Sequence, residues 1–196
     1  MIRENITRTD DGSAVEPATL AEVKNYIKEN YGTDTVEDTL ITDMITAARM
    51  FIENETQVAL ALQDIVYWAM DEDEAIGELR LPFAPVNTIT SVVRKDMEGT
   101  ETELTLNSDY YSYGLENDWI RLNKTWSTGA VDRDPIYITY ESGHATAAAM
   151  PKELKLACMK LVAENYVNRD SSVDWSISSV PYDVAVWIEH YKRADF

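Results

Sequence analysis

Ser142, Gly143 and His144 form the one place in the chain where a nucleophile and a base lie close together in the sequence. A serine hydrolase of the strand–turn–helix type needs its nucleophile in a Gly-x-Ser-x-Gly setting between a strand and a helix. Here Ser142 follows Glu141 and precedes Gly143 at the end of an expected strand. The pattern is therefore more typical of a strand exit assisted by glycine than of a catalytic serine.

The chain also lacks a recognisable set of ligands for a metal or a phosphate. Its single cysteine, Cys158, and its two histidines, His144 and His190, cannot supply a Cys/His zinc site. The acidic run 71–74 lacks the glycine and the terminal glutamate of an EF-hand loop. The 7 glycines are scattered singly, which excludes a phosphate-binding glycine-rich loop. We therefore expect no cofactor, no metal and no catalytic residue, although a glycosidase-type carboxylate pair stays open in so acidic a chain.

Charge is the strongest deviation in the composition: 35 acidic and 17 basic residues give a formal net charge of −18. Such a surface repels phosphate backbones, which disfavours binding of duplex DNA through basic contacts. The charge either keeps the protein soluble or forms a surface that lies near nucleic acid without binding it tightly. Residues 1–11 lack the apolar core of a signal peptide, and no stretch approaches the ~20 apolar residues of a membrane span. We expect a soluble protein made in the cytoplasm.

Two helices are expected in the first part of the chain. Thr19 and Glu22 match a capping box, which predicts a helix from there to about residue 30. The second helix should span about 36–56, with Arg49 and Glu53 on its outer face. Its expected inward ladder consists of Leu40, Ile41, Met44, Ile45, Ala48, Phe51 and Ile52.

Short aromatic and β-branched runs follow, separated by turn residues, and they predict about six strands in a small antiparallel sheet or barrel. Helical periodicity returns at Pro151, with Leu154, Cys158 and Leu161 facing inward, and Pro181 opens a last helix. The predicted fold class is α+β: a small helical bundle of two N-terminal and two C-terminal helices, interrupted by an antiparallel β insert. The helical lobe would comprise residues 1–56 and 144–196, and the insert 57–143.

For two groups of apolar residues, the sequence does not decide whether they pack on their own chain or on a partner. Trp175 and Ile177 lie in a serine-rich loop, where they either fold back on the core or wait for a partner surface. The last helix has Trp187 and Tyr191 on one face, which docks either on the first two helices or on a neighbouring subunit.

Several short runs occur in a characteristic order along the chain. They are residues 17–24, 40–57, 79–86 followed by 89–92, 140–143, 151–155, 180–184 and 191–193. In this order they resemble the head–tail connector (adaptor) proteins of long-tailed bacteriophages and related prophages, in the variant with a β insert in a helical bundle. The resemblance covers residues 16–193.

This resemblance implies a structural virion protein in the neck, at the head–tail junction. Such adaptors form a homo-oligomeric ring, usually twelvefold, under the portal protein. They extend the channel through which DNA passes without specific binding, and they provide a platform for the next neck or tail-completion protein. By resemblance, portal docking falls to Trp187, Ile188, Tyr191, Lys192 and Arg193.

The alternative function belongs to another class. A small hydrolase or carbohydrate-binding module could use the Tyr/Trp-rich sheet, which includes Tyr110, Tyr111 and Tyr113, together with scattered carboxylates. That alternative predicts a deep cleft with converging polar groups in a monomer. A neighbouring neck or tail-completion protein is a third possibility, which differs from the adaptor in its partners.

Overall fold

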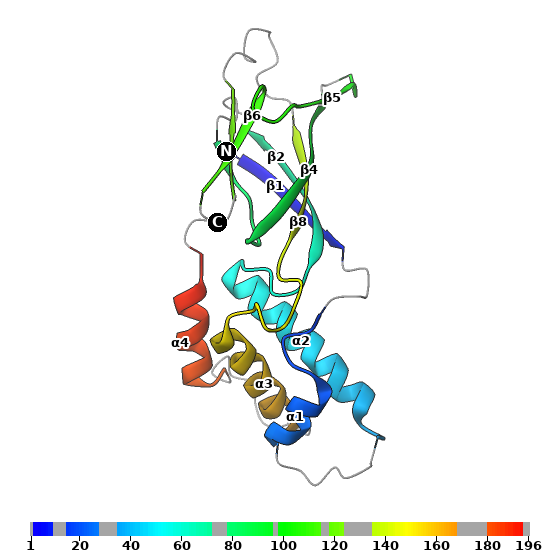
Figure 1. The fold of residues 1–196 in the computed structure, drawn as a ribbon, viewed down its shortest axis with the longest axis vertical. Coiled ribbons are helices and arrows are strands. Elements are labelled where there is room, and N and C mark those ends of the chain that lie inside the picture. The colour runs from blue at the N-terminus through cyan, green and yellow to red at the C-terminus, as the bar shows by residue number, and fades with distance from the viewer. Residues whose placement is uncertain are drawn as a thin grey trace. The chain divides into compact units, whose positions relative to one another are not determined.

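The chain divides into two compact units, each described here by itself. The β unit comprises Met1–Ala14 and Leu62–Gly143, and the helical unit comprises Val15–Ala61 and His144–Phe196. The α+β class predicted from the sequence is confirmed, because one unit is built from strands and the other from helices (Figure 1). The computed structural model describes residues 2–9, 15–27, 35–71, 78–95, 98–114, 118–123, 135–167 and 180–193.

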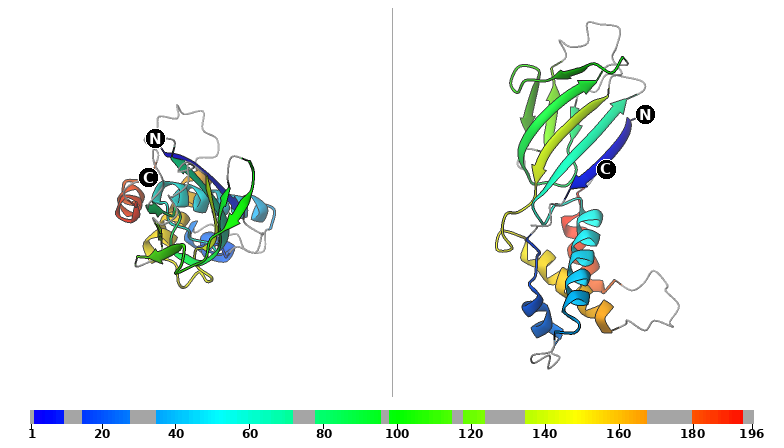
Figure 2. Two further views of the ribbon diagram at one scale, coloured as in Figure 1. Left: turned by 90° about the horizontal axis from the view of Figure 1, so that it is seen from above. Right: turned by 90° about the vertical axis from the view of Figure 1, so that its right-hand side faces the viewer.

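The β unit contains two antiparallel sheets. The five-stranded sheet has the order β1 (Ile2–Thr9), β2 (Gln63–Asp71), β8 (Ile136–Ser142), β4 (Val86–Lys95) and β5 (Glu101–Glu103). Its long strands lie side by side in the right-hand view of Figure 2. The three-stranded sheet has the order β3 (Glu78–Arg80), β7 (Trp119–Leu122) and β6 (Tyr110–Tyr113).

Alternation along the central strand β8 decides which face of the larger sheet is buried. Ile136, Ile138 and Tyr140 are buried, whereas Tyr137 and Thr139 between them are half-buried. The Tyr140 hydroxyl donates to the Pro82 carbonyl oxygen at 2.7 Å, so the phenol is satisfied inside the core. One face of this sheet therefore belongs to the core of the β unit and the other is open to solvent.

The first strand is a correction to the sequence-based division. The prediction assigned residues 1–56 to the helical lobe, but β1 pairs along its whole length with β2, from Ile2 opposite Asp71 to Thr9 opposite Asp64. Residues 1–14 therefore belong to the β unit, and residues 57–61 belong to the helical unit. The described residues form eight strands where about six were expected. The pairing of β1 depends on residues about 60 positions away, which no local pattern reveals.

The helical unit contains α1 (Leu20–Ile27), α2 (Asp38–Thr56), α3 (Lys152–Val167) and α4 (Tyr182–Tyr191). The predicted capping box is confirmed, since the Glu22 N–H donates to Thr19 Oγ1 at 3.2 Å and the Thr19 N–H donates to Glu22 Oε2 at 2.9 Å. Pro151 immediately precedes α3, and its carbonyl accepts from the Lys155 N–H at 3.0 Å. Both helix starts thus follow from local sequence.

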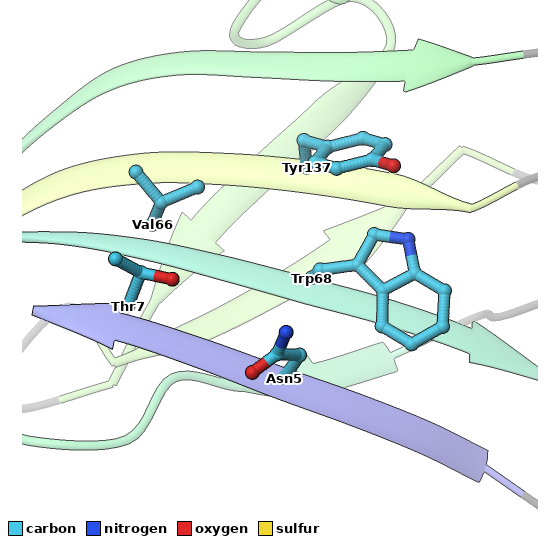
Figure 3. Close-up of a pocket in the computed structure, with 5 residues that line it drawn as sticks. All are labelled: Asn5, Thr7, Val66, Trp68 and Tyr137. Carbon is cyan, nitrogen blue, oxygen red and sulfur yellow. The ribbon is translucent and has the colours of Figure 1, made fainter.

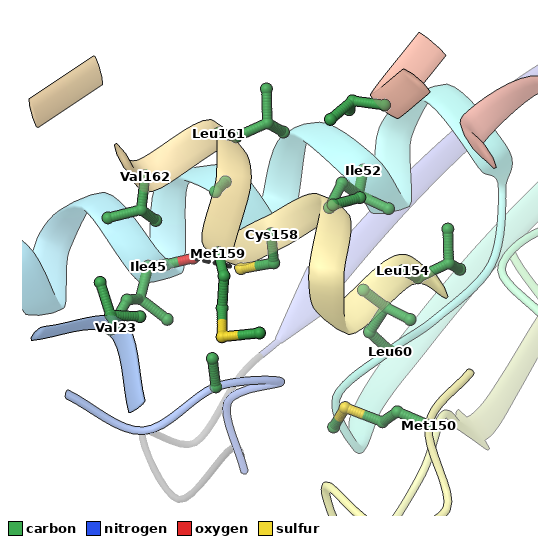
Figure 4. Close-up of a cluster of buried hydrophobic side chains, with 14 of the residues drawn as sticks. Val23, Ile45, Ile52, Leu60, Met150, Leu154, Cys158, Met159, Leu161 and Val162 are labelled. Atoms are coloured by element: carbon green, nitrogen blue, oxygen red, sulfur yellow. Dashed lines mark hydrogen bonds between the residues drawn. The ribbon is translucent and has the colours of Figure 1, made fainter. Parts of the chain in front are cut away.

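The core of the helical unit gathers the inner faces of all four helices (Figure 4). Of the ladder expected on α2, Ile41, Ile45, Ala48 and Ile52 are buried, and Met44 packs at the edge of the core. Leu40 and Phe51 are 39% and 37% exposed, so the expectation that they point inward is wrong. On α3 and α4 the buried residues include Leu154, Ala157, Cys158, Leu161, Val162, Tyr166, Val184 and Ile188.

Arg49 and Glu53 also correct the sequence analysis, which placed them on the outer face of α2. Both are buried, and the Glu53 side chain is inaccessible to solvent. Glu53 Oε1 accepts the backbone N–H groups of Leu60 at 2.9 Å and Ala61 at 3.2 Å, while Arg49 lies 3.3 Å from Glu53 Oε2. Arg49 also donates to Glu16 at 3.0 Å. The carboxylate therefore fixes the segment after α2, where regular backbone pairing has ended.

The ion pair between α1 and α3 gives the helical unit a predicted dependence on pH. The Lys155 ammonium lies 2.8 Å from Glu22 Oε1 and, with the Thr19 N–H, lowers the pKa of Glu22 to about 2. Because this folded-state pKa lies below the unfolded value, the stabilisation is present above about pH 4.5 and is lost as pH falls towards about 2. We expect Glu22→Gln to reduce this acid-dependent loss in the free energy of unfolding by less than about 1 kcal/mol, since the ion pair is exposed and screened. Urea unfolding at a series of acidic pH values checks this, and parallel curves for the two proteins would contradict it.

Candidate functional site

Ser142 is not available as a nucleophile in this structure. Its side chain is buried, and its hydroxyl lies within hydrogen-bonding distance of the carbonyl oxygens of Phe83 and Pro85, the latter at 2.7 Å. Asn87 reinforces the same strand end by donating to the Gly143 carbonyl at 2.9 Å. Gly143 has φ +104°, a left-handed conformation that favours glycine. The geometry fits the strand exit predicted from the sequence.

The described residues contain no group of three or more histidine, cysteine or carboxylate side chains that could hold a metal ion. Cys158 is buried in the helical core and its thiol points at the Ile45 carbonyl oxygen, 3.8 Å away (Figure 4). Burial raises the pKa of Cys158 to about 12. A thiol in this state is a packing group and is unreactive at neutral pH.

An open groove of about 290 Å³ lies on the solvent-facing side of the five-stranded sheet. Asn5 and Thr7 of β1, Val66 and Trp68 of β2 and Tyr137 of β8 line it (Figure 3). These side chains come from neighbouring strands in register, since Trp68 is opposite both Asn5 and Tyr137. The described residues that line the groove have apolar, amide and hydroxyl groups and no carboxylate, so these residues supply no acid–base pair for hydrolysis.

The tyrosines singled out in the sequence lie on the other sheet. Tyr110 is buried, whereas Tyr111 and Tyr113 are 45% and 40% exposed. Tyr113 stacks on Trp119 with ring centroids 6.1 Å apart. Arg80 covers the other side of this cluster, 5.7 Å from the Trp119 ring, and pairs with Asp118 at 3.0 Å. In the described strands the aromatic residues lie on two sheets, and the groove takes Trp68 and Tyr137 but none of Tyr110, Tyr111 and Tyr113. The carbohydrate-binding alternative requires aromatic residues that converge on one cleft.

The residues expected to dock on a portal lie at the end of α4, and several of them pack within their own helical unit. Ile188 is 7% exposed in the helical core, and Trp187 and Tyr191 pack at its edge. The Arg193 N–H donates to the Thr56 carbonyl oxygen at 3.1 Å. Lys192 is exposed. The sequence left open whether this face docks on the chain's own helices or on a neighbouring subunit. The inner face of α4 packs within its own helical unit. Trp175 and Ile177, the other candidate partner residues, lie outside the described residues.

Most basic side chains in the described part of the chain are engaged by acidic ones. The pairs are Lys24–Asp38, Arg49–Glu16, Arg49–Glu53, Arg80–Asp118, Lys95–Glu101, Arg121–Glu78, Lys155–Glu22 and Lys160–Asp183. The excess carboxylates that give the chain its charge of −18 therefore dominate its field. This acidic surface repels a phosphate backbone.

Sequence reasoning missed the outer face of α2. Leu40, Ala47, Met50 and Phe51 are exposed along this 19-residue helix, and Asp43 lies among them. The signal was present, because an apolar ladder that includes both Leu40 with Ile41 and Phe51 with Ile52 is wider than one buried stripe requires.

Of the helices in the described part of the chain, none has the length and apolar composition that crossing a bilayer requires.

Comparison with solved structures finds chains of similar fold over almost the full length of this one. The sequence matches no protein-family model and no curated protein. A chain from the neck of the empty GTA particle, computed with C6 symmetry, superposes with a TM-score of 0.71 at 20% identity, over 99% of this chain and 97% of that one. The chain has the fold of a GTA neck protein. The resemblance predicted from the sequence is borne out at the level of the fold.

Two further solved chains agree with this match. One is from the virion of the native gene transfer agent (GTA) particle, with a TM-score of 0.67 at 21% identity over 97% of each chain. The other is from the neck of the native GTA particle, computed with C12 symmetry, with a TM-score of 0.66 at 21% identity over 99% of this chain and 97% of that one. Both units are included in these matches, since almost the full length is covered.

Proposed function

We propose that this chain is a head–tail connector of a phage-like particle. It forms a ring in the neck under the portal protein, extends the DNA channel and provides a platform for the next neck or tail-completion protein. The observation that carries the proposal is the full-length match to chains from a GTA neck, in which both the β unit and the helical unit are present. In this proposal the protein has a structural role: it is made in the host cytoplasm and acts in the virion neck.

The symmetry of the matched particles supports a ring. The GTA necks were solved with C6 and C12 symmetry, so their chains repeat around an axis. A cyclic assembly needs one surface of each copy to fit a different surface of the next copy. We propose the same arrangement here, with twelve copies around the DNA axis as in the C12 neck.

The charge of the chain suits a conduit for DNA. A net charge of −18 per copy, with most described cations already paired, leaves a channel wall that does not hold phosphates. DNA therefore passes without specific binding in this proposal. A basic lining would instead retain the genome during ejection.

Portal docking is proposed for the end of α4, with roles divided by burial. Ile188 anchors the helix in its own core, so its contribution is to position the others. Trp187, Tyr191 and Arg193 keep part of their surface open, and Lys192 is exposed. These four residues would contact the portal directly.

Native mass measurement across a range of salt and protein concentrations tests ring formation. Free subunits repel one another through their acidic surfaces, and at 1 M salt the Debye length shrinks to about 3 Å. We therefore expect monomers at low salt and a closed oligomer of defined size as salt and concentration rise. Assembly that weakens as salt rises, or an open series of sizes without a preferred one, would contradict the proposal.

A further inference from the structure

The outer face of α2 is an apolar surface with no covering element among the described residues. Leu40, Met44, Ala47 and Phe51 follow one another at intervals of four, three and four, which places them in one row along the helix. Leu40 and Phe51 are 39% and 37% exposed, and the neighbouring Met50 is 45% exposed. We call the surface formed by Leu40, Asp43, Ala47, Met50 and Phe51 the α2 face. A contiguous apolar row of this kind is typical of a protein–protein contact.

A second exposed apolar surface lies on the outer side of α3 and α4. The two helices run antiparallel, because Lys160 pairs with Asp183 and the Tyr191 hydroxyl donates to Glu153 at 3.0 Å. Leu156 is 43% exposed on α3, and Tyr182 and Val186 are 86% and 47% exposed one turn apart on α4. We call the surface formed by Leu156, Tyr182 and Val186 the α3–α4 face.

The two faces point away from one another. The inner sides of α2 and α4 enter the same hydrophobic core through Ile45, Ile52, Val184 and Ile188. Figure 1 shows α4 and α2 at opposite sides of the helical unit, and the exposed residues of each helix lie away from this shared core. A copy that offers one face on each side can contact two neighbours at once, as a ring requires.

The exposed charged residues around the two faces are mostly acidic. The charged side chains on the exposed surface of α2 are acidic, with Asp43 on the α2 face and Glu55 near its end. On the exposed surfaces of α3 and α4, Lys152 is accompanied by the exposed carboxylates of Glu153, Glu164 and Glu189. The apolar residues therefore carry the contact, and copies repel one another until salt screens their charges.

We infer that neighbouring copies of this chain contact one another head to tail, with the α2 face of one copy against the α3–α4 face of the next. The occupant of the α2 face is thus a second copy of the same chain. The inference rests on the proposed ring and adds which surfaces build it. Exposed apolar residues form the centre of this contact.

Paired cysteine substitutions test this contact. The double variant Ala47→Cys/Val186→Cys places one thiol on each face, and both positions are exposed, so the fold should be retained. In salt conditions that give the closed oligomer, a short bismaleimide linker should produce a ladder of covalent oligomers. We expect about tenfold more product than in either single variant, since the interface holds the two thiols at a high effective concentration. Cys158 should not react with the linker because it is buried.

The matched control is Ala47→Cys/Thr90→Cys, in which the second thiol is exposed but lies on neither face. A closed oligomer in which the test pair gives no more product than this control would overturn the inference while the proposed ring stands. Covalent dimers from Ala47→Cys alone would also overturn it, because they indicate a twofold contact between two α2 faces. If no closed oligomer forms under any condition, the proposed function itself is wrong, and the inference with it.

Discussion

Replacing Glu53 with alanine should destabilise the helical unit by about 3–5 kcal/mol, the largest effect we expect from one substitution. The carboxylate is fully buried and accepts the N–H groups of Leu60 and Ala61 as well as Arg49. Alanine would leave two buried N–H donors without an acceptor and would remove one of the carboxylates beside a buried guanidinium. Urea unfolding followed by far-UV circular dichroism measures the effect.

Two variants on the same helix sharpen this test. Glu53→Gln keeps an acceptor oxygen for the backbone N–H groups but loses the charge opposite Arg49, so its loss should be smaller than that of alanine. Glu55→Ala removes an exposed carboxylate and should change the free energy of unfolding by less than about 0.5 kcal/mol. Equal effects of Glu53→Ala and Glu55→Ala would show that the buried network contributes nothing particular to stability.

The second large effect distinguishes two leucines of α3 that are two residues apart. Leu154 has no exposed surface, whereas Leu156 is 43% exposed. Leu154→Ala leaves a cavity in the helical core and should cost about 2–5 kcal/mol. Leu156→Ala should cost less than about 0.5 kcal/mol in the monomer, because its side chain makes few buried contacts there.

Assembly should respond in the opposite order. Leu156 lies on the α3–α4 face, so Leu156→Ala should shift closed-oligomer formation to higher protein concentration while the monomer melts almost as the wild type does. Native mass and thermal unfolding of the same samples separate the two readouts. A Leu156→Ala protein that is strongly destabilised but assembles normally would contradict the assignment of this residue to an interface.

Local signals predicted much of the fold. Thr19 with Glu22 gave the start of α1, and Pro151 and Pro181 marked the starts of α3 and α4, because capping and proline geometry depend only on nearby residues. The α+β class also followed from the change in periodicity along the chain. The pairing of β1 did not follow, since its partner β2 is remote in sequence and edge pairing leaves no local trace.

Burial was harder to predict than helix position. Apolar residues surround much of α2, so periodicity identified a helix but could not separate Ile41 and Ile52, which are buried, from Leu40 and Phe51, which are not. Glu53 was assigned to the outer face because it lies off the apolar ladder, and the N–H groups that compensate its burial lie in an irregular segment. The stripe of Trp187 and Tyr191 similarly could not show whether its partner was its own chain or another.

Electron microscopy of the assembled protein tests the central claim most directly. The chain is brought to the salt and protein concentrations that favour closed oligomers and is then imaged in negative stain. We predict rings with twelvefold rotational symmetry and a central opening wide enough for duplex DNA, by analogy with the C12 neck. Closed oligomers without an axial opening, or particles with only twofold symmetry, would contradict the account.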